Sequence, residues 1–187
     1  MATTPWQTVG PFFSPLLLRP GDADLTRGGA AAGPAITLAG QVRQEGGAPV
    51  PGALIEIWQA NAAGRYAHPA DRGDAPLDPA FRGFGRALTD ADGRYAFRTV
   101  RPGAVPGPGN APQAPHILVS IVAAGLLRRL VTRIYFPDEP LNETDPVLAT
   151  VDDPEARRTL IARTEGDGRY RFDIVLRGEG ETAFFTD

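Results

Sequence analysis

Short runs of aliphatic, β-branched and aromatic residues, each closed by a cluster of Gly, Pro or Asp, recur along the chain from residue 35 onward. This punctuation is typical of β-strands joined by turns. In the run 170–176, polar Arg171 and Asp173 alternate with apolar neighbours, as expected for a strand with one buried face. Strands are therefore predicted over residues 36–43, 53–59, 95–100, 116–123, 130–136, 170–176 and 182–185.

The composition is that of a folded protein with many turns. The chain has 22 Gly and 19 Pro among 187 residues, while its 42% hydrophobic and 22% charged residues are ordinary for a globular protein. The excess of Gly and Pro therefore indicates turns rather than disorder. We expect a single all-β domain over residues 1–187, an antiparallel β-sandwich with long loops at 61–92 and 101–115.

Two segments depart from the strand pattern. Residues 1–34 predict an irregular N-terminal arm, but Trp6, Phe12 and Phe13 make it too apolar for a free tail. The arm therefore requires a surface, either of its own domain or of a partner. One short helix is predicted from Asp153, a good N-cap residue followed by proline, to about residue 163.

The tripeptide Gly-Arg-Tyr occurs three times, at 64–66, 93–95 and 168–170. The second and third copies follow an aspartate and lead into alternating runs. Asp-Gly before such a run is a hairpin signal, because glycine accepts the positive φ of a tight turn. Two similar hairpins are favoured over an internal duplication.

Missing residue types exclude several chemistries. There is no Cys, which removes thiol nucleophiles, cysteine metal sites and disulfides. All 19 basic residues are Arg, so Schiff-base chemistry and a P-loop lysine are also excluded. The two histidines, His68 and His116, cannot build a three-histidine metal site.

Charge and hydropathy exclude two classes of partner. The net charge is −3 without a concentrated basic surface, which argues against nucleic-acid binding. The longest uncharged apolar stretch, 119–127, is far too short to span a bilayer. Residues 1–10 lack the basic and then apolar pattern of a secretory signal, so a cytoplasmic location is expected.

The residues alone favour binding or assembly over catalysis. His116 opens a predicted strand, where a second ligand on the same face would stand at position 118, which is Leu118. His116 is therefore either a structural histidine or a single ligand. His68 fits a turn. Asp71, Asp74 and Asp78 share one loop without a calcium-binding spacing.

Strings at 52–66, 78–86, 89–97, 101–103 and 170–185 carry more information about function than the composition does. Through them, the chain resembles the intradiol ring-cleavage dioxygenases over about residues 5–187. That resemblance implies a β-sandwich and an Fe(III) enzyme that uses O2 to open a small aromatic substrate between its two hydroxylated carbons. In one branch of the family two homologous chains assemble into higher oligomers, and only one of them binds iron.

The resemblance also implies a vestigial site. The family holds ferric iron with two tyrosinates and two histidines, whose hard phenolate oxygens suit Fe(III). The corresponding positions here are Gly73 or a neighbour, Val105, His116 and Leu118, so three of the four ligands are absent. Gln113 stands where the family has a substrate-assisting arginine. The chain is therefore expected to hold no metal and no catalytic residue, with the iron on its homologous partner chain.

Three further expectations follow from the resemblance. In the arm, Thr8, Gly10, Pro11 and Phe12 would form a wall of the partner's substrate pocket. Ala124 stands where relatives carry an arginine that contributes to that pocket. Arg133 is either an exposed strand arginine or a charged lining of the vestigial site. The alternative function is a stand-alone β-sandwich module for binding or assembly, without enzyme activity.

Overall fold

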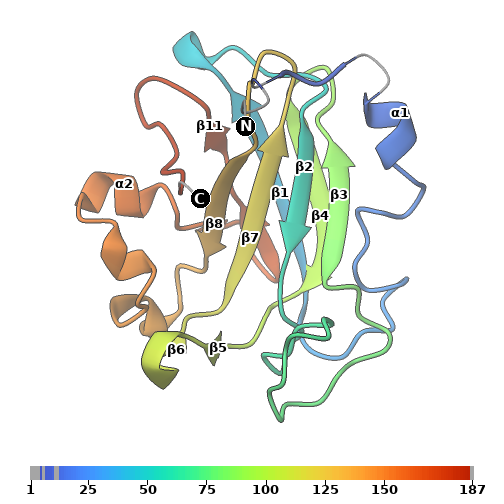
Figure 1. Ribbon diagram of the computed structural model, residues 1–187, viewed down its shortest axis with the longest axis vertical. Helices are drawn as coiled ribbons and strands as arrows, with labels where there is room; N and C mark the ends of the chain where they lie inside the picture. Colours follow the sequence, from blue (N-terminus) through green and yellow to red (C-terminus); the bar gives the residue numbers. More distant parts are fainter. Residues whose placement is uncertain (1–4, 6, 11–12, 186–187) are drawn as a thin grey trace.

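The computed structural model describes residues 5, 7–10 and 13–185, and two β-sheets packed against each other form its centre (Figure 1). The first sheet contains β1 (Ala35–Arg43), β4 (Arg94–Val100), β9 (Arg163–Thr164), β10 (Arg169–Arg171) and β11 (Ile174–Val175). The second contains β2 (Leu54–Trp58), β3 (Phe84–Leu88), β7 (His116–Val122) and β8 (Leu130–Tyr135). A separate two-stranded sheet pairs β5 (Val105–Pro106) with β6 (Pro112–Gln113).

The helical segments are short. The α-helices are α1 (Phe13–Leu17) and α2 (Pro154–Arg158). The 3-10 turns are η1 (Glu45–Gly47), η2 (Pro108–Asn110), η3 (Pro140–Glu143) and η4 (Leu148–Thr150). None of the helices in the described part of the chain is long and apolar enough to cross a membrane.

Alternation along the strands builds the core between the two sheets. In β1, side chains alternate between buried and more exposed positions, as the sequence pattern predicts. Fully buried side chains from the first sheet, such as Leu38 and Phe97, share one cluster with Ile55 and Ile121 from the second. The predicted β-sandwich is thus confirmed, and its apolar interior contains residues from both sheets.

The first sheet is mixed rather than purely antiparallel. β1 pairs antiparallel with β4 on one side, and parallel with β10 and then β11 on the other. The parallel partners come from the last part of the chain, so Thr37 aligns with Arg169. Hydrophobic alternation does not encode strand direction, which is why the sequence pattern missed this pairing.

The predicted strand 170–176 is interrupted between β10 and β11 because residues 172 and 173 bend over β1. Phe172 lies against Gly40, whose lack of a side chain leaves room for the Phe172 carbonyl oxygen. That oxygen accepts a hydrogen bond of 2.6 Å from the buried Tyr95 hydroxyl. The Asp173 carboxylate accepts from the Gln41 backbone N–H at 3.1 Å, in place of a backbone partner.

Several other expectations need correction. β3, β5 and β6 lie inside the predicted loops 61–92 and 101–115. The segment 182–185 is not a strand, although Phe185 makes an isolated bridge to Val131. The helix after Asp153 is present with its predicted cap, but it ends at residue 158 because residues 160–162 turn to hydrogen-bond the end of β8. Of the two predicted Asp-Gly hairpins, only the one at 167–168 is formed, between β9 and β10. The turn at 92–93 instead connects β3 in the second sheet with β4 in the first.

The arm contains a core residue. Leu25 is completely buried, and its backbone N–H donates to the Arg98 carbonyl in the first sheet. Its own carbonyl accepts from Arg82, and the Asp22 carbonyl accepts from Arg86 in β3. Residues 22–25 therefore close the side of the sandwich between β4 and β3, where Gly85 leaves space for the leucine side chain.

Candidate functional site

Five of the six positions assigned to a vestigial site lie together. Leu118 in β7 is paired with Arg133 in β8, and Val105 in β5 is paired with Gln113 in β6. Arg133 Nη1 donates to Gln113 Oε1 at 2.7 Å, which links the two pairs. His116 begins β7 directly beside the end of β8. These five positions therefore lie close together, at the end of the second sheet beside the β5–β6 hairpin.

Gly73 is an exposed loop position outside this cluster. Its backbone N–H donates to Asp71 Oδ1 at 2.8 Å, and Asp71 Oδ2 in turn accepts from the Tyr66 N–H at 2.8 Å. These backbone hydrogen bonds, with the nearby Arg65 guanidinium, hold the pKa of the Asp71 carboxyl below its usual range. Hydrogen bonds through Asp71 and Tyr66 connect Gly73 to His116 of the cluster.

His116 is buried and bonded on both ring nitrogens. Nδ1 lies 2.7 Å from the Ala114 carbonyl oxygen, and this nitrogen carries the proton because a carbonyl can only accept. Nε2 lies 3.5 Å from the Tyr66 hydroxyl, which donates to it. Burial, with a smaller effect of the Arg133 cation, lowers the pKa of His116 to about 4. The imidazole is therefore neutral at pH 7.

Arg133 belongs to an internal polar network. Besides Gln113, its Nη1 approaches the Tyr135 hydroxyl at 3.5 Å. Tyr135 donates to Asp145 Oδ1 at 3.1 Å, and the fully buried Asp145 also accepts from the Ala114 backbone N–H at 2.7 Å. Of the two interpretations of Arg133, the geometry therefore favours a charged side chain directed at the site.

Two tyrosines at this site were missed by the sequence analysis. Tyr66 stacks on Trp58 with ring centroids 5.8 Å apart and planes 6° from parallel. The Tyr135 ring lies 5.8 Å from the His116 ring. Burial raises the pKa of both phenols, although the Arg133 cation partly opposes the rise. A signal for Tyr135 was present, because it stands two residues after Arg133 and so faces the same side of β8.

These residues do not fit a ferric ion. Iron of this charge needs phenolate or other anionic oxygens, whereas the Tyr66 and Tyr135 hydroxyls donate to His116 and Asp145 and the Arg133 guanidinium lies beside Tyr135. Each His116 nitrogen already has a partner within the chain. Throughout the described residues, no group of three or more His, Asp or Glu side chains is placed to hold a metal. The arrangement is a satisfied network of hydrogen bonds.

The arm touches the turn between β7 and β8. Thr8 Oγ1 accepts a hydrogen bond of 2.9 Å from the Gly125 backbone N–H. The Gly10 carbonyl accepts from Phe13, the first residue of α1. Ala124 is exposed beside this contact. Pro11 and Phe12, which were assigned to the partner's pocket wall, lie outside the described residues.

Comparison with known proteins places the chain among ring-cleaving enzymes. A family model described as "Dioxygenase" matches residues 9–178. The chain is 41% identical over 196 residues to the protocatechuate 3,4-dioxygenase alpha chain of Pseudomonas putida, covering 97% of this chain and 95% of the relative. It is 48% identical over 180 residues to the beta chain from Burkholderia cepacia, covering 88% and 75%.

A solved structure agrees with the fold. The dioxygenase domain of a dioxygenase carbohydrate-binding protein fusion from Streptomyces sp. SirexAA-E has a TM-score of 0.63 and 30% identity to this chain. The match covers 97% of this chain and all of that domain. The resemblance noted from the sequence motifs is thus supported by sequence and by structure.

Proposed function

The chain belongs to the dioxygenase family of intradiol ring-cleaving enzymes, and we propose that it is the alpha subunit of a protocatechuate 3,4-dioxygenase, the subunit without iron. The similarity to an alpha chain extends over nearly the whole length of both proteins. The higher identity to a beta chain covers a smaller share of both chains and reflects the common origin of the two subunits.

One observation carries the proposal. At the positions that correspond to the family's iron ligands, this chain offers Gly73 or a neighbour, Val105 and Leu118, and only His116 remains. The two nitrogens of that histidine are bonded to Ala114 and Tyr66. An enzyme that contains this chain therefore needs a second, homologous chain to hold Fe(III), which supplies the redox chemistry of ring opening.

The assembled enzyme would cleave 3,4-dihydroxybenzoate between its hydroxylated carbons. Both atoms of O2 enter the product, 3-carboxy-cis,cis-muconate, so no further reductant is required. This chain contributes its fold, its interface with the partner and the wall formed by residues 8–12 of the arm. The contact of Thr8 with Gly125 supports this role, because it fixes the arm to the β7–β8 turn just before Gly10 and Pro11.

Co-expression with the iron-binding chain tests the proposal. We expect a stoichiometric coloured complex that cleaves 3,4-dihydroxybenzoate, whereas this chain alone is colourless and binds no stoichiometric iron. Iron analysis, the visible spectrum and oxygen uptake are measured for the pair and for each chain alone. A tyrosinate-to-iron absorption band from this chain alone would contradict the assignment. Failure of the two chains to associate would favour the stand-alone module.

Deletion of residues 1–12 should weaken substrate binding in the assembled enzyme. Because the arm positions substrate without supplying a catalytic group, we expect KM to rise about tenfold, equivalent to roughly 1.4 kcal/mol of lost binding. Iron content should not change, since the metal ligands lie on the other chain. Steady-state kinetics and iron analysis of the truncated complex provide the measurement.

A matched pair of substitutions tests whether the arm must be held at the β7–β8 turn in order to affect substrate binding. Thr8→Val removes the acceptor for the Gly125 N–H, whereas Thr8→Ser keeps it. We expect only the valine variant to raise KM. An intact truncated complex with unaltered KM and kcat would remove the arm from the site, and loss of iron would show that the arm shapes the metal centre.

A further inference from the structure

A second concave site lies away from His116. It is a cleft of about 670 Å³ bounded by residues 43–47, the segment that follows α2, and the loop after β11. Apolar side chains, including Ile161 and Phe172, form part of its lining. Its charged lining residues are Arg43, Arg158, Arg163, Arg171, Arg177, Asp173 and Glu179.

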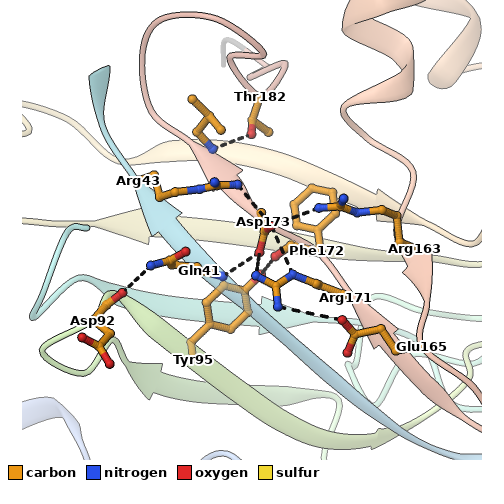
Figure 2. Close-up of polar contacts among 11 residues, drawn as sticks. Gln41, Arg43, Asp92, Tyr95, Arg163, Glu165, Arg171, Phe172, Asp173 and Thr182 are labelled. Carbon is orange, nitrogen blue, oxygen red and sulfur yellow. Dashed lines mark hydrogen bonds and ion pairs between the residues drawn. The ribbon is translucent and has the colours of Figure 1, made fainter. Parts of the chain in front are cut away.

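Asp173 lines this cleft and lies at the centre of its polar contacts, which form the cleft floor (Figure 2). Its side chain is only 8% exposed and meets three guanidinium groups. Arg171 binds both carboxylate oxygens, with Nη2 3.0 Å from Oδ1 and Nε 3.2 Å from Oδ2. Arg43 and Arg163 each reach Oδ2 through one Nη2, at 3.1 and 3.0 Å. These three arginines come from β1, β9 and β10, which the fold brings together here.

The floor carries more positive than negative charge. The only other carboxylate of the described residues that pairs with these guanidiniums is Glu165, 3.8 Å from Arg171. Two carboxylates thus pair with three guanidiniums, and the remaining carboxylate of the lining, Glu179, is exposed in the loop after β11. Arg43 and Arg163 each donate a single hydrogen bond within the described part of the chain, although a guanidinium has five N–H groups.

Two further arginines lie at the rim of the cleft, and each forms only a weak, exposed ion pair. Arg158 pairs with Glu155 and Arg177 pairs with Glu45, and all four side chains are at least 66% exposed. Exposed ion pairs of long side chains contribute little and are readily exchanged. Arg158 and Arg177 can therefore turn toward an anion in the cleft without a large loss.

We propose that this cleft binds a small oxyanion, the carboxylate or phosphate group of a metabolite, at Arg43 and Arg163. Planar guanidinium groups match the oxygens of both anions, and a partly apolar lining accommodates an organic body. The volume is within the range of small-molecule sites. The inference is independent of the proposed function, because every residue belongs to this chain and none to the His116 cluster.

Binding of two probe anions tests the inference. The full-length chain, in the state in which it purifies, is titrated with inorganic phosphate and with citrate by calorimetry, against sodium chloride of equal ionic strength. We expect saturable binding of at least one anion with a dissociation constant in the millimolar range or below. Binding of phosphate alone identifies phosphate as the preferred group, binding of citrate alone identifies carboxylate, and binding of both confirms their shared chemistry.

Substitutions locate the bound anion. Arg163→Gln should weaken binding at least tenfold and should not unfold the protein, because the Arg163 side chain is 71% exposed. Arg163→Lys keeps the positive charge but loses the planar guanidinium with its two parallel N–H donors. Its affinity for the anion should lie between those of the wild type and Arg163→Gln. Arg94→Gln is the matched control, because Arg94 pairs with Asp92 at the surface outside the cleft. Absence of binding above the chloride control, or equal affinity of Arg163→Gln and the wild type, would overturn the proposal.

Discussion

Replacement of Leu25 by alanine is expected to lower the free energy of unfolding by about 3 kcal/mol, within the range for large-to-small changes in a core. Leu25 is fully buried in a segment whose backbone hydrogen-bonds to both sheets. The substitution would leave a cavity between β3 and β4. Because the Leu25 side chain packs closely against Gly85, the backbone there has little freedom to move in and fill it. Urea unfolding followed by circular dichroism measures the change.

Leu16→Ala provides the control for this experiment. Leu16 belongs to the same N-terminal arm, but 78% of it is exposed. Its removal should change the free energy of unfolding by less than about 0.5 kcal/mol. Equal effects of the two substitutions would show that the segment around Leu25 does not close the sandwich in solution.

Acidification from pH 7 to pH 4 is expected to remove about 3 kcal/mol of stability through His116 alone. Its folded-state pKa of about 4 lies below the ordinary value of 6.5. Between these values the unfolded chain binds the proton and the folded chain does not, so stability is lost as the pH falls from 6.5 toward 4. Burial is the main cause of the lowered pKa and the Arg133 cation adds to it, while the Ala114 carbonyl and Asp145 oppose the shift only in part.

His116→Asn isolates this contribution. Asparagine can still donate to the Ala114 carbonyl, but it does not titrate in this range. The difference in unfolding free energy between wild type and variant should therefore shrink or reverse by about 3 kcal/mol between pH 7 and pH 4. A difference that stays constant across this range would mean that His116 is accessible to protons in the folded protein.

Strands with a clear hydrophobic pattern were predictable, and strands without one were missed. β1 and β4 alternate between buried and more exposed side chains, whereas β7 is an almost continuous apolar run that is buried on both faces. β3 contains Gly85 and lacks such a pattern, because its position depends on the arm segment that packs against it. The break between β10 and β11 depends on Tyr95 and Gly40, which are far away in the sequence.

The site was predictable where motifs fixed positions and not where the fold brings distant residues together. The family motifs assigned Gln113 and His116 to one site, whereas the sequence left Arg133 open between an exposed strand position and a charged lining of that site. Tyr66 reaches His116 from a separate loop, a contact that no local pattern in the sequence encodes. Asp145 likewise lies in the segment between β8 and α2, and only tertiary structure places it against Tyr135.

The parallel alignment of β1 with β10 has a consequence for synthesis on the ribosome. Thr37 and its partner Arg169 are separated by 132 residues, and β11 follows only after that. At 5–20 residues per second, the nascent β1 waits roughly 7 to 26 s before this edge can be covered. Throughout that interval its unpaired backbone groups are open to other chains. The protein is therefore most prone to aggregation before β10 and β11 pair with β1, and this late pairing, rather than early local folding, sets the length of that period.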